Sequence, residues 1–141
     1  MLTIALATSL GGIFLFLAVF HMYWLFGGKQ WLDSVIPTKE HEDSVFEVPQ
    51  IATLFSALFL FAFAVVYFIM SVWIEWDYSV AFLNKIYWFL PAIFTLRAIG
   101  DFRYLGFFKK VKSTKFGQAD SKVFAPLCLG IGITGFLIQL I

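Results

Sequence analysis

The sequence has 141 residues, of which 61% are hydrophobic and 13% are charged. A soluble domain carries roughly 25% charged residues, so this composition excludes a soluble globular domain and favours a membrane as solvent. Ten lysines and arginines nearly balance nine aspartates and glutamates, and the single cysteine, Cys128, excludes a disulfide within the sequence. The length suits one compact unit, so we expect residues 1–141 to form a single integral membrane domain.

Three long apolar stretches carry no charged residue, and each predicts a membrane-spanning helix. They cover residues 2–26, 51–74 and 123–141, close to or above the roughly 20 apolar residues that a helix needs to cross a bilayer. The first stretch lacks a basic amino-terminal region and an A-x-A-like cleavage site. We therefore interpret it as a retained span rather than a signal peptide.

A fourth and less apolar stretch, at about residues 82–102, contains Lys85, Pro91, Arg97 and Asp101. We still expect a span here, because its apolar neighbours would otherwise be joined by a mixed linker with no core to bury against. Pro91 removes a backbone hydrogen bond and predicts a kink. The predicted fold class is all-α, a four-helix transmembrane bundle with up-down topology.

The basic residues are concentrated in the first and third loops of this layout. The two loops, at about residues 27–49 and 103–122, hold eight of the ten lysines and arginines. The positive-inside rule places both loops in the cytoplasm and both termini on the outer side of the membrane.

The same two loops differ in charge, which predicts an attraction between them. The third loop has six basic residues, whereas the first has five acidic ones: Asp33, Glu40, Glu42, Asp43 and Glu47. We expect the loops to lie against each other as a small cap, held modestly because an exposed ion pair contributes about 0–1 kcal/mol.

Small residues in the first and last spans mark faces where backbones can approach closely. They are Ser9, Gly12, Gly130, Gly132 and Gly135. Two interpretations stay open, internal packing of the bundle and an interface with a partner.

Charged residues at membrane depth are costly and usually mark a working site. Arg97 and Asp101 are four residues apart, which puts them on one helical face, and Tyr104 continues the same stripe. His21 and Trp24 lie toward the same side of the membrane in the first span. We therefore predict one polar site shared by the two spans, with Arg103 beside it.

Two interpretations of this cluster are open. Arg97 and Asp101 can simply neutralise each other and join helices. Alternatively Arg97 binds an anion, because its planar fork suits phosphate or carboxylate, Asp101 orients it or accepts a proton, and His21 changes charge near neutral pH.

A run of lysines follows the fourth stretch and consists of Lys109, Lys110, Lys112 and Lys115. It indicates either control of membrane topology or attraction to anionic lipid headgroups, and not nucleic-acid binding. His21, His41 and Cys128 are not spaced as metal ligands, so we expect no metal and no cofactor.

Three segments of the chain resemble a family of small bacterial membrane proteins that is catalogued as a domain of unknown function. The segments are residues 21–28, 96–109 and 114–128, and the Arg-x-x-Gly-Asp-Phe run that begins at Arg97 is the most specific. The resemblance implies four spans and a bacterial inner membrane, and it implies no activity. It points to these positions: His21, Tyr23, Trp24, Gly27, Gly28, Arg97, Gly100, Asp101, Arg103, Gly106, Asp120 and Pro126.

The leading functional hypothesis is a non-enzymatic membrane protein that binds a lipid headgroup or a partner subunit through the cytoplasmic-side polar cluster. Its partners would be membrane lipids, other membrane subunits or further copies of the chain. One alternative is a membrane-embedded enzyme acting on a lipid or isoprenoid-like substrate, with His21 and Asp101 as acid and base. A substrate cleft that reaches His21 from the lipid would favour it. A second alternative is a small oligomeric transporter, which requires a water path from His21 to the outer face.

Overall fold

The computed structural model describes residues 1–36, 49–73, 81–102 and 104–141. Every secondary-structure element in these residues is a helix. In chain order they are α1 (Leu2–Leu25), α2 (Leu32–Val35), α3 (Gln50–Trp73), α4 (Ala81–Ile99), α5 (Lys115–Ala119), the π-helical turn η1 (Asp120–Phe124) and α6 (Ala125–Leu140). The all-helical fold class is thus confirmed for the described part of the chain.

Within the described residues, three helical segments are long and apolar enough to cross a membrane. They are Leu2–Leu25, Gln50–Val72 and Lys115–Leu140. The first two agree with the apolar stretches in the sequence. The third begins well before residue 123, because α5, η1 and α6 follow one another without a break.

The early start of this last helix has a local cause. The Thr114 side chain accepts a hydrogen bond of 2.9 Å from the Gly117 N–H, and an N-cap of this kind satisfies a donor that the first helical turn leaves free. Pro126, which cannot donate to an α-helical ladder, is the second residue after η1. The π-helical turn therefore occurs where the ladder loses a donor in any case.

The end of α4 differs from the sequence-based expectation of a span to residue 102. The helix ends at Ile99, and Gly100 takes a left-handed conformation with φ of +89°, which is a common way to end a helix. The chain then folds back, so that the Phe107 N–H donates to the Ala98 carbonyl at 2.9 Å. The expectation that Arg97, Asp101 and Tyr104 share one helical face is wrong, because only Arg97 is in the helix.

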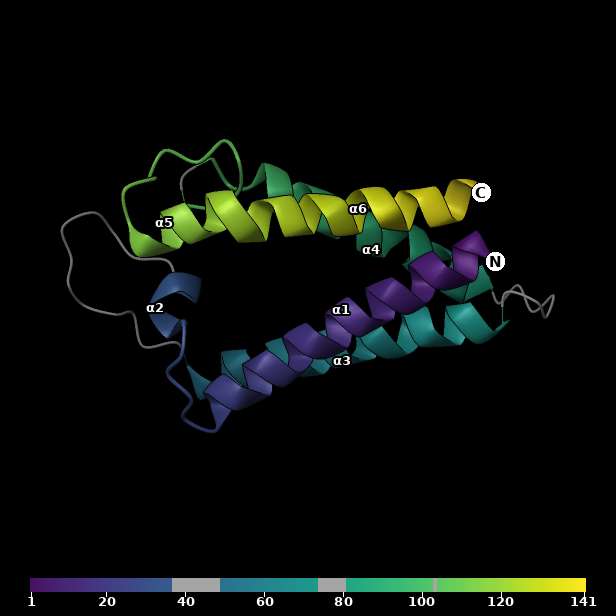
Figure 1. Ribbon diagram of the computed structural model, residues 1–141, viewed down its shortest axis with the longest axis horizontal. Coiled ribbons are helices and arrows are strands. Elements are labelled where there is room, and N and C mark those ends of the chain that lie inside the picture. Colours follow the sequence, from purple (N-terminus) through teal and green to yellow (C-terminus); the bar gives the residue numbers. More distant parts are fainter. Residues whose placement is uncertain (37–48, 74–80, 103) are drawn as a thin grey trace.

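The long helices pack as two close pairs, α1 with α3 and α4 with α6 (Figure 1). The buried ring of Phe14 on α1 joins these pairs, because it stacks on Tyr67 of α3 at 5.6 Å between centroids and contacts Phe94 of α4 at 5.1 Å. Gly132 and Gly135 of α6 are buried against α4. Their packing supports the internal interpretation of these two small residues.

A Cβ atom at Gly135 would lie 2.7 Å from the Pro91 Cβ, and one at Gly132 would lie against the Thr95 hydroxyl. A larger residue at either position would push α4 and α6 apart. By contrast, Gly12 and Gly130 have nothing within 4 Å of an added Cβ.

The two termini lie at one end of the molecule, and α2 and α5 lie at the other, which we call the loop end (Figure 1). There α2 packs on α5, and the Lys115 ammonium lies 3.6 Å from the Asp33 carboxylate. The predicted contact between the acidic and basic loops is confirmed for Asp33. The remaining acidic residues of the first loop, Glu40, Glu42, Asp43 and Glu47, lie outside the described residues, as does His41.

Candidate functional site

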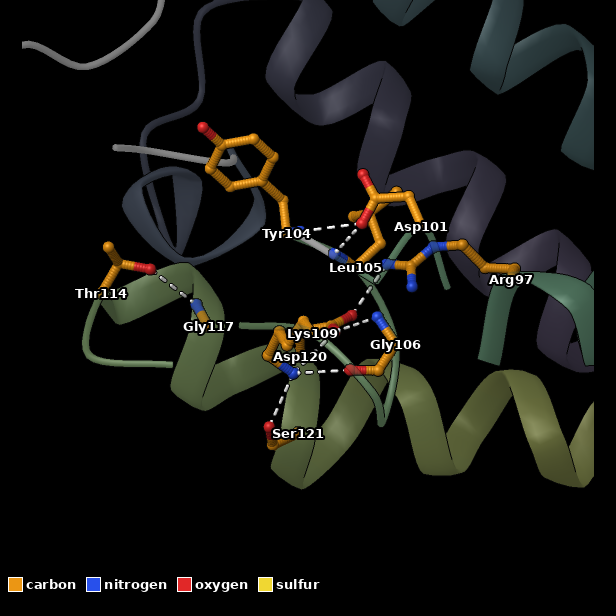
Figure 2. A network of polar contacts seen from close by, with 10 residues as sticks. All are labelled: Arg97, Asp101, Tyr104, Leu105, Gly106, Lys109, Thr114, Gly117, Asp120 and Ser121. Atoms are coloured by element: carbon orange, nitrogen blue, oxygen red, sulfur yellow. Dashed lines mark hydrogen bonds and ion pairs between the residues drawn. The ribbon is translucent and has the colours of Figure 1, made fainter. Parts of the chain in front are cut away.

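A buried cluster of charged side chains joins α4, the segment after it and the start of the last long helix (Figure 2). At its centre is Asp120, the first residue of η1, whose side chain is 0% exposed. One carboxylate oxygen accepts from Arg97 Nη2 at 2.8 Å, and the other accepts from Lys109 Nζ at 3.0 Å and from the Gly106 N–H at 2.7 Å. Two cations therefore share one buried carboxylate.

Lys109 is the second fully buried member of this cluster. Its Nζ donates to Asp120, to the Gly106 carbonyl at 2.9 Å and to the Ser121 hydroxyl at 2.6 Å. An ammonium group has three protons, so its donors are all used. The expectation that Lys109 binds a lipid headgroup is therefore wrong, because this side chain is 0% exposed and already satisfied.

Arg97 is the only partly exposed member of the three charged residues Arg97, Lys109 and Asp120. Its side chain is 28% exposed, and only Nη2 contacts Asp120. Nη1 is buried and has no hydrogen-bond partner within the described residues. The guanidinium thus has a spare donor directly beside its ion pair.

Asp101 has a different task from the one predicted for it. Its Oδ1 accepts from the Tyr104 N–H at 2.8 Å and the Leu105 N–H at 2.9 Å, so the carboxylate holds the turn after α4 (Figure 2). The turn, and not a shared face of one helix, brings Tyr104 close to Asp101. Arg103, the neighbouring predicted residue, lies outside the described residues.

Gly106 allows the turn to approach α4 closely. It has φ of +82°, and an added Cβ would meet the backbone carbonyls of Ile99 and Ala98. Only glycine combines this conformation with this contact. Its N–H and C=O are thereby presented to Asp120 and Lys109.

His21 lies on α1 and belongs to another feature, an apolar cavity of about 380 Å³ at the loop end of the bundle. His21 Nδ1 is 2.8 Å from the Leu17 carbonyl oxygen, and its ring contacts Trp24 edge to face at 5.1 Å. Neither Arg97 nor Asp101 is among the residues that line the cavity. The structure therefore brings His21 and Trp24 together, but it does not bring them into the cluster of Arg97.

The other predicted headgroup residues are Lys110, Lys112 and Lys115, and all three are exposed. Lys115 is the one that pairs with Asp33. Among the described residues between α4 and α5, Lys110 and Lys112 are thus the exposed cations.

Sequence reasoning on spans and periodicity missed the centre of the site, since it assigned Asp120 to a loop. The available signals were Asp120 as the one acidic residue among the basic residues of that segment, and its match with Gly106 to the resembled family. Ser121 gave no signal of its own.

These features define a small protein whose described part is all helical, with three helices apolar enough to cross a membrane and a buried charged cluster at the loop end. The chain belongs to the family described as protein of unknown function (DUF3995), whose model matches residues 14–134. This confirms the expected membership of an uncharacterised family. No curated protein and no solved structure matches the chain.

Proposed function

We propose that the chain is a four-span protein of a bacterial inner membrane that binds the headgroup of an anionic lipid at Arg97 and catalyses no reaction. In this proposal α4 spans the membrane together with the three more apolar helical segments. The loop end faces the cytoplasm and both termini face the periplasm. The observation that carries it is the partly exposed guanidinium of Arg97, which shares its carboxylate partner with Lys109 and whose Nη1 has no hydrogen-bond partner among the described residues.

The dimensions of α4 support its place as a span. Its 19 residues extend about 28 Å at 1.5 Å per residue, close to the roughly 30 Å of the hydrocarbon core. It packs along α6, and its charged residues Lys85 and Arg97 lie near its two ends. Long basic side chains at such positions can reach the interface.

The electrostatics of the loop end support an anionic ligand. Arg97 shares its carboxylate partner with Lys109, so Asp120 does not neutralise both cations. A phosphate that approaches the exposed part of the Arg97 guanidinium is a suitable acceptor for it, since guanidinium groups bind phosphates with more than one N–H. Exposed Lys110 and Lys112 add attraction of about 1 kcal/mol each near an anionic surface.

The separation of the predicted acid and base supports binding over catalysis. His21 makes its hydrogen bond to Leu17 and lines the apolar cavity, whereas Asp101 holds the turn after α4. General acid–base catalysis requires both groups within reach of one substrate.

The experiment is lipid retention by the purified protein. The protein is reconstituted in nanodiscs with equal fractions of phosphatidylglycerol and phosphatidylcholine, extracted in a mild detergent, and its bound lipids are measured by native mass spectrometry. The sharpest variant is Arg97→Lys, which keeps the charge beside Asp120 but lacks the second guanidinium nitrogen. The control is Lys85→Gln at the other end of α4.

We expect wild type and Lys85→Gln to retain phosphatidylglycerol in preference to phosphatidylcholine. Arg97→Lys should reduce that preference about five- to tenfold, the equivalent of one charge-assisted hydrogen bond. Equal retention of both lipids by wild type, or an unchanged preference in folded Arg97→Lys, contradicts the proposal.

A further inference from the structure

The cavity beside His21 lies at the loop end, between α1, the segment that contains α2, and the helix formed by α5, η1 and α6. Its volume of about 380 Å³ is within the range of roughly 300–1,000 Å³ that is typical of ligand pockets. The lining is almost entirely carbon and rich in aromatic rings. The lining residues used below are Phe20, His21, Trp24, Trp31, Val123 and Leu127.

The hydrogen bond of His21 fixes which of its nitrogen atoms is available. A carbonyl oxygen can only accept, so the contact with the Leu17 carbonyl makes Nδ1 the donor. In the neutral ring, Nε2 then carries a lone pair. No described residue donates a hydrogen bond to Nε2.

The walls around this imidazole are held in place by specific contacts. Trp31 stacks on Phe20 at 5.5 Å between centroids, and the Trp24 indole N–H donates to the Gln30 carbonyl at 2.9 Å. Trp31 has φ of +60°, a costly conformation for an aromatic residue that persists only where the surroundings impose it. The ion pair between Asp33 and Lys115 joins this wall to α5.

These features select the chemistry of the occupant. A pure hydrocarbon chain would fill the cavity but leave Nε2 without a donor, at the cost of an unsatisfied polar group. An anion would find no cation in the lining, because Arg97 is not part of it. An apolar molecule with a hydroxyl group satisfies both the carbon walls and the lone pair.

We propose that this cavity binds one apolar chain or ring that carries a hydroxyl, and that the hydroxyl donates a hydrogen bond to His21 Nε2. Arg97 does not line this cavity. This proposal therefore goes beyond the proposed headgroup binding and is tested independently of it. Membrane alcohols of two kinds have this chemistry, linear prenyl alcohols and ring-bearing phenols.

The test compares an alcohol with its own methyl ether. A long-chain alcohol with a diazirine in its chain, and the matching methyl ether, are photocrosslinked to the full-length protein in neutral nanodiscs. Labelled peptides are quantified by mass spectrometry. Competition with unlabelled farnesol and with pentylphenol distinguishes a chain from a ring as the preferred occupant.

Three variants locate the site. His21→Phe keeps an aromatic ring but removes the acceptor. Val123→Trp fills the cavity from a residue that is 54% exposed, and Leu137→Trp makes the same change at a residue of α6 that is 46% exposed and outside the lining.

We expect the alcohol to label peptides that contain Trp24, Trp31 or Leu127, at least about fivefold more than the ether. His21→Phe should remove that difference, Val123→Trp should abolish labelling by both probes, and Leu137→Trp should change neither. Equal labelling of wild type by alcohol and ether overturns the proposal, as does undiminished labelling of Val123→Trp. If His21→Phe fails to fold, the comparison of the two probes on wild type still decides.

Discussion

The Lys109 ammonium lies 3.0 Å from the Asp120 carboxylate, and neither side chain is exposed. The two residues come from different parts of the chain, Lys109 from the segment after α4 and Asp120 from the last long helix. Their contact, with that of Arg97, fixes this segment between α4 and η1. Burying an ion pair has a desolvation cost, but removing one partner destabilises the protein more, because the other charge is then buried without compensation.

Asp120→Asn should therefore strongly destabilise the protein. It keeps the shape of the side chain but leaves Arg97 and Lys109 without their shared negative charge. We expect a loss of about 3–5 kcal/mol in the free energy of unfolding, measured by thermal or denaturant unfolding in detergent.

The control for this change is Asp33→Asn, which removes the exposed ion pair with Lys115. Exposed pairs contribute about 0–1 kcal/mol, so this variant should unfold almost like wild type. Equal stabilities of Asp120→Asn and Asp33→Asn would contradict the described cluster.

Amine acetylation should distinguish Lys109 from its neighbours. Lys110 and Lys112 are exposed, whereas Lys109 reacts only when the segment opens, because its Nζ is buried with three acceptors. We expect Lys109 to react at least about tenfold more slowly, as followed by peptide mass spectrometry during brief labelling. Detergent-unfolded protein provides the control, in which all three lysines should react at similar rates.

Gly106→Ala should destabilise the protein through both conformation and contact. Alanine disfavours the φ of +82°, and its Cβ would meet the carbonyls of Ile99 and Ala98. Gly27→Ala separates these two effects, because Gly27 has φ of +92° and nothing within 4 Å of an added Cβ.

We expect a loss of about 1–2 kcal/mol for Gly27→Ala and of more than about 3 kcal/mol for Gly106→Ala, since overpacking adds to strain. Unfolding midpoints of the two variants provide the comparison. A smaller loss at Gly106 than at Gly27 would show that the turn does not lie against α4 as described.

The long helices could be predicted from the sequence, because a long run of uncharged apolar residues is typical of a helix that crosses a membrane. The sequence also contained the signal that ends α4, a glycine at position 100 after the last apolar turn. Spacing arguments overrode that signal, because Arg97 and Asp101 fit a helical face so well. Helical spacing is informative only where the helix continues.

The burial of Asp120 could not be derived from its neighbours. The polar residues Asp120, Ser121 and Lys122 indicate a loop. No sequence pattern predicted the π-helical turn that contains them. The cations that compensate the buried charge of Asp120 are Lys109 and Arg97, which are 11 and 23 residues away in the sequence. Such contacts depend on the tertiary fold.

A pair of double-mutant cycles tests this revision of the site. The first cycle combines Arg97→Ala with Asp120→Ala, and the second combines Arg97→Ala with Asp101→Ala. Helical spacing predicts strong coupling in the second cycle, whereas the structure places the ion pair in the first. Coupling between contacting residues is typically about 0.5–3 kcal/mol.

We expect the Arg97–Asp120 coupling to exceed 1 kcal/mol, a value in about the middle of that range, and the Arg97–Asp101 coupling to be clearly smaller. Asp101→Ala should still destabilise the protein, since Tyr104 and Leu105 lose the acceptor of their N–H groups. Unfolding free energies of the five variants and wild type give both couplings. Should the second coupling exceed the first, the ion pair would belong to Asp101, and the carboxylate of Asp120 would have only Lys109 as its cation.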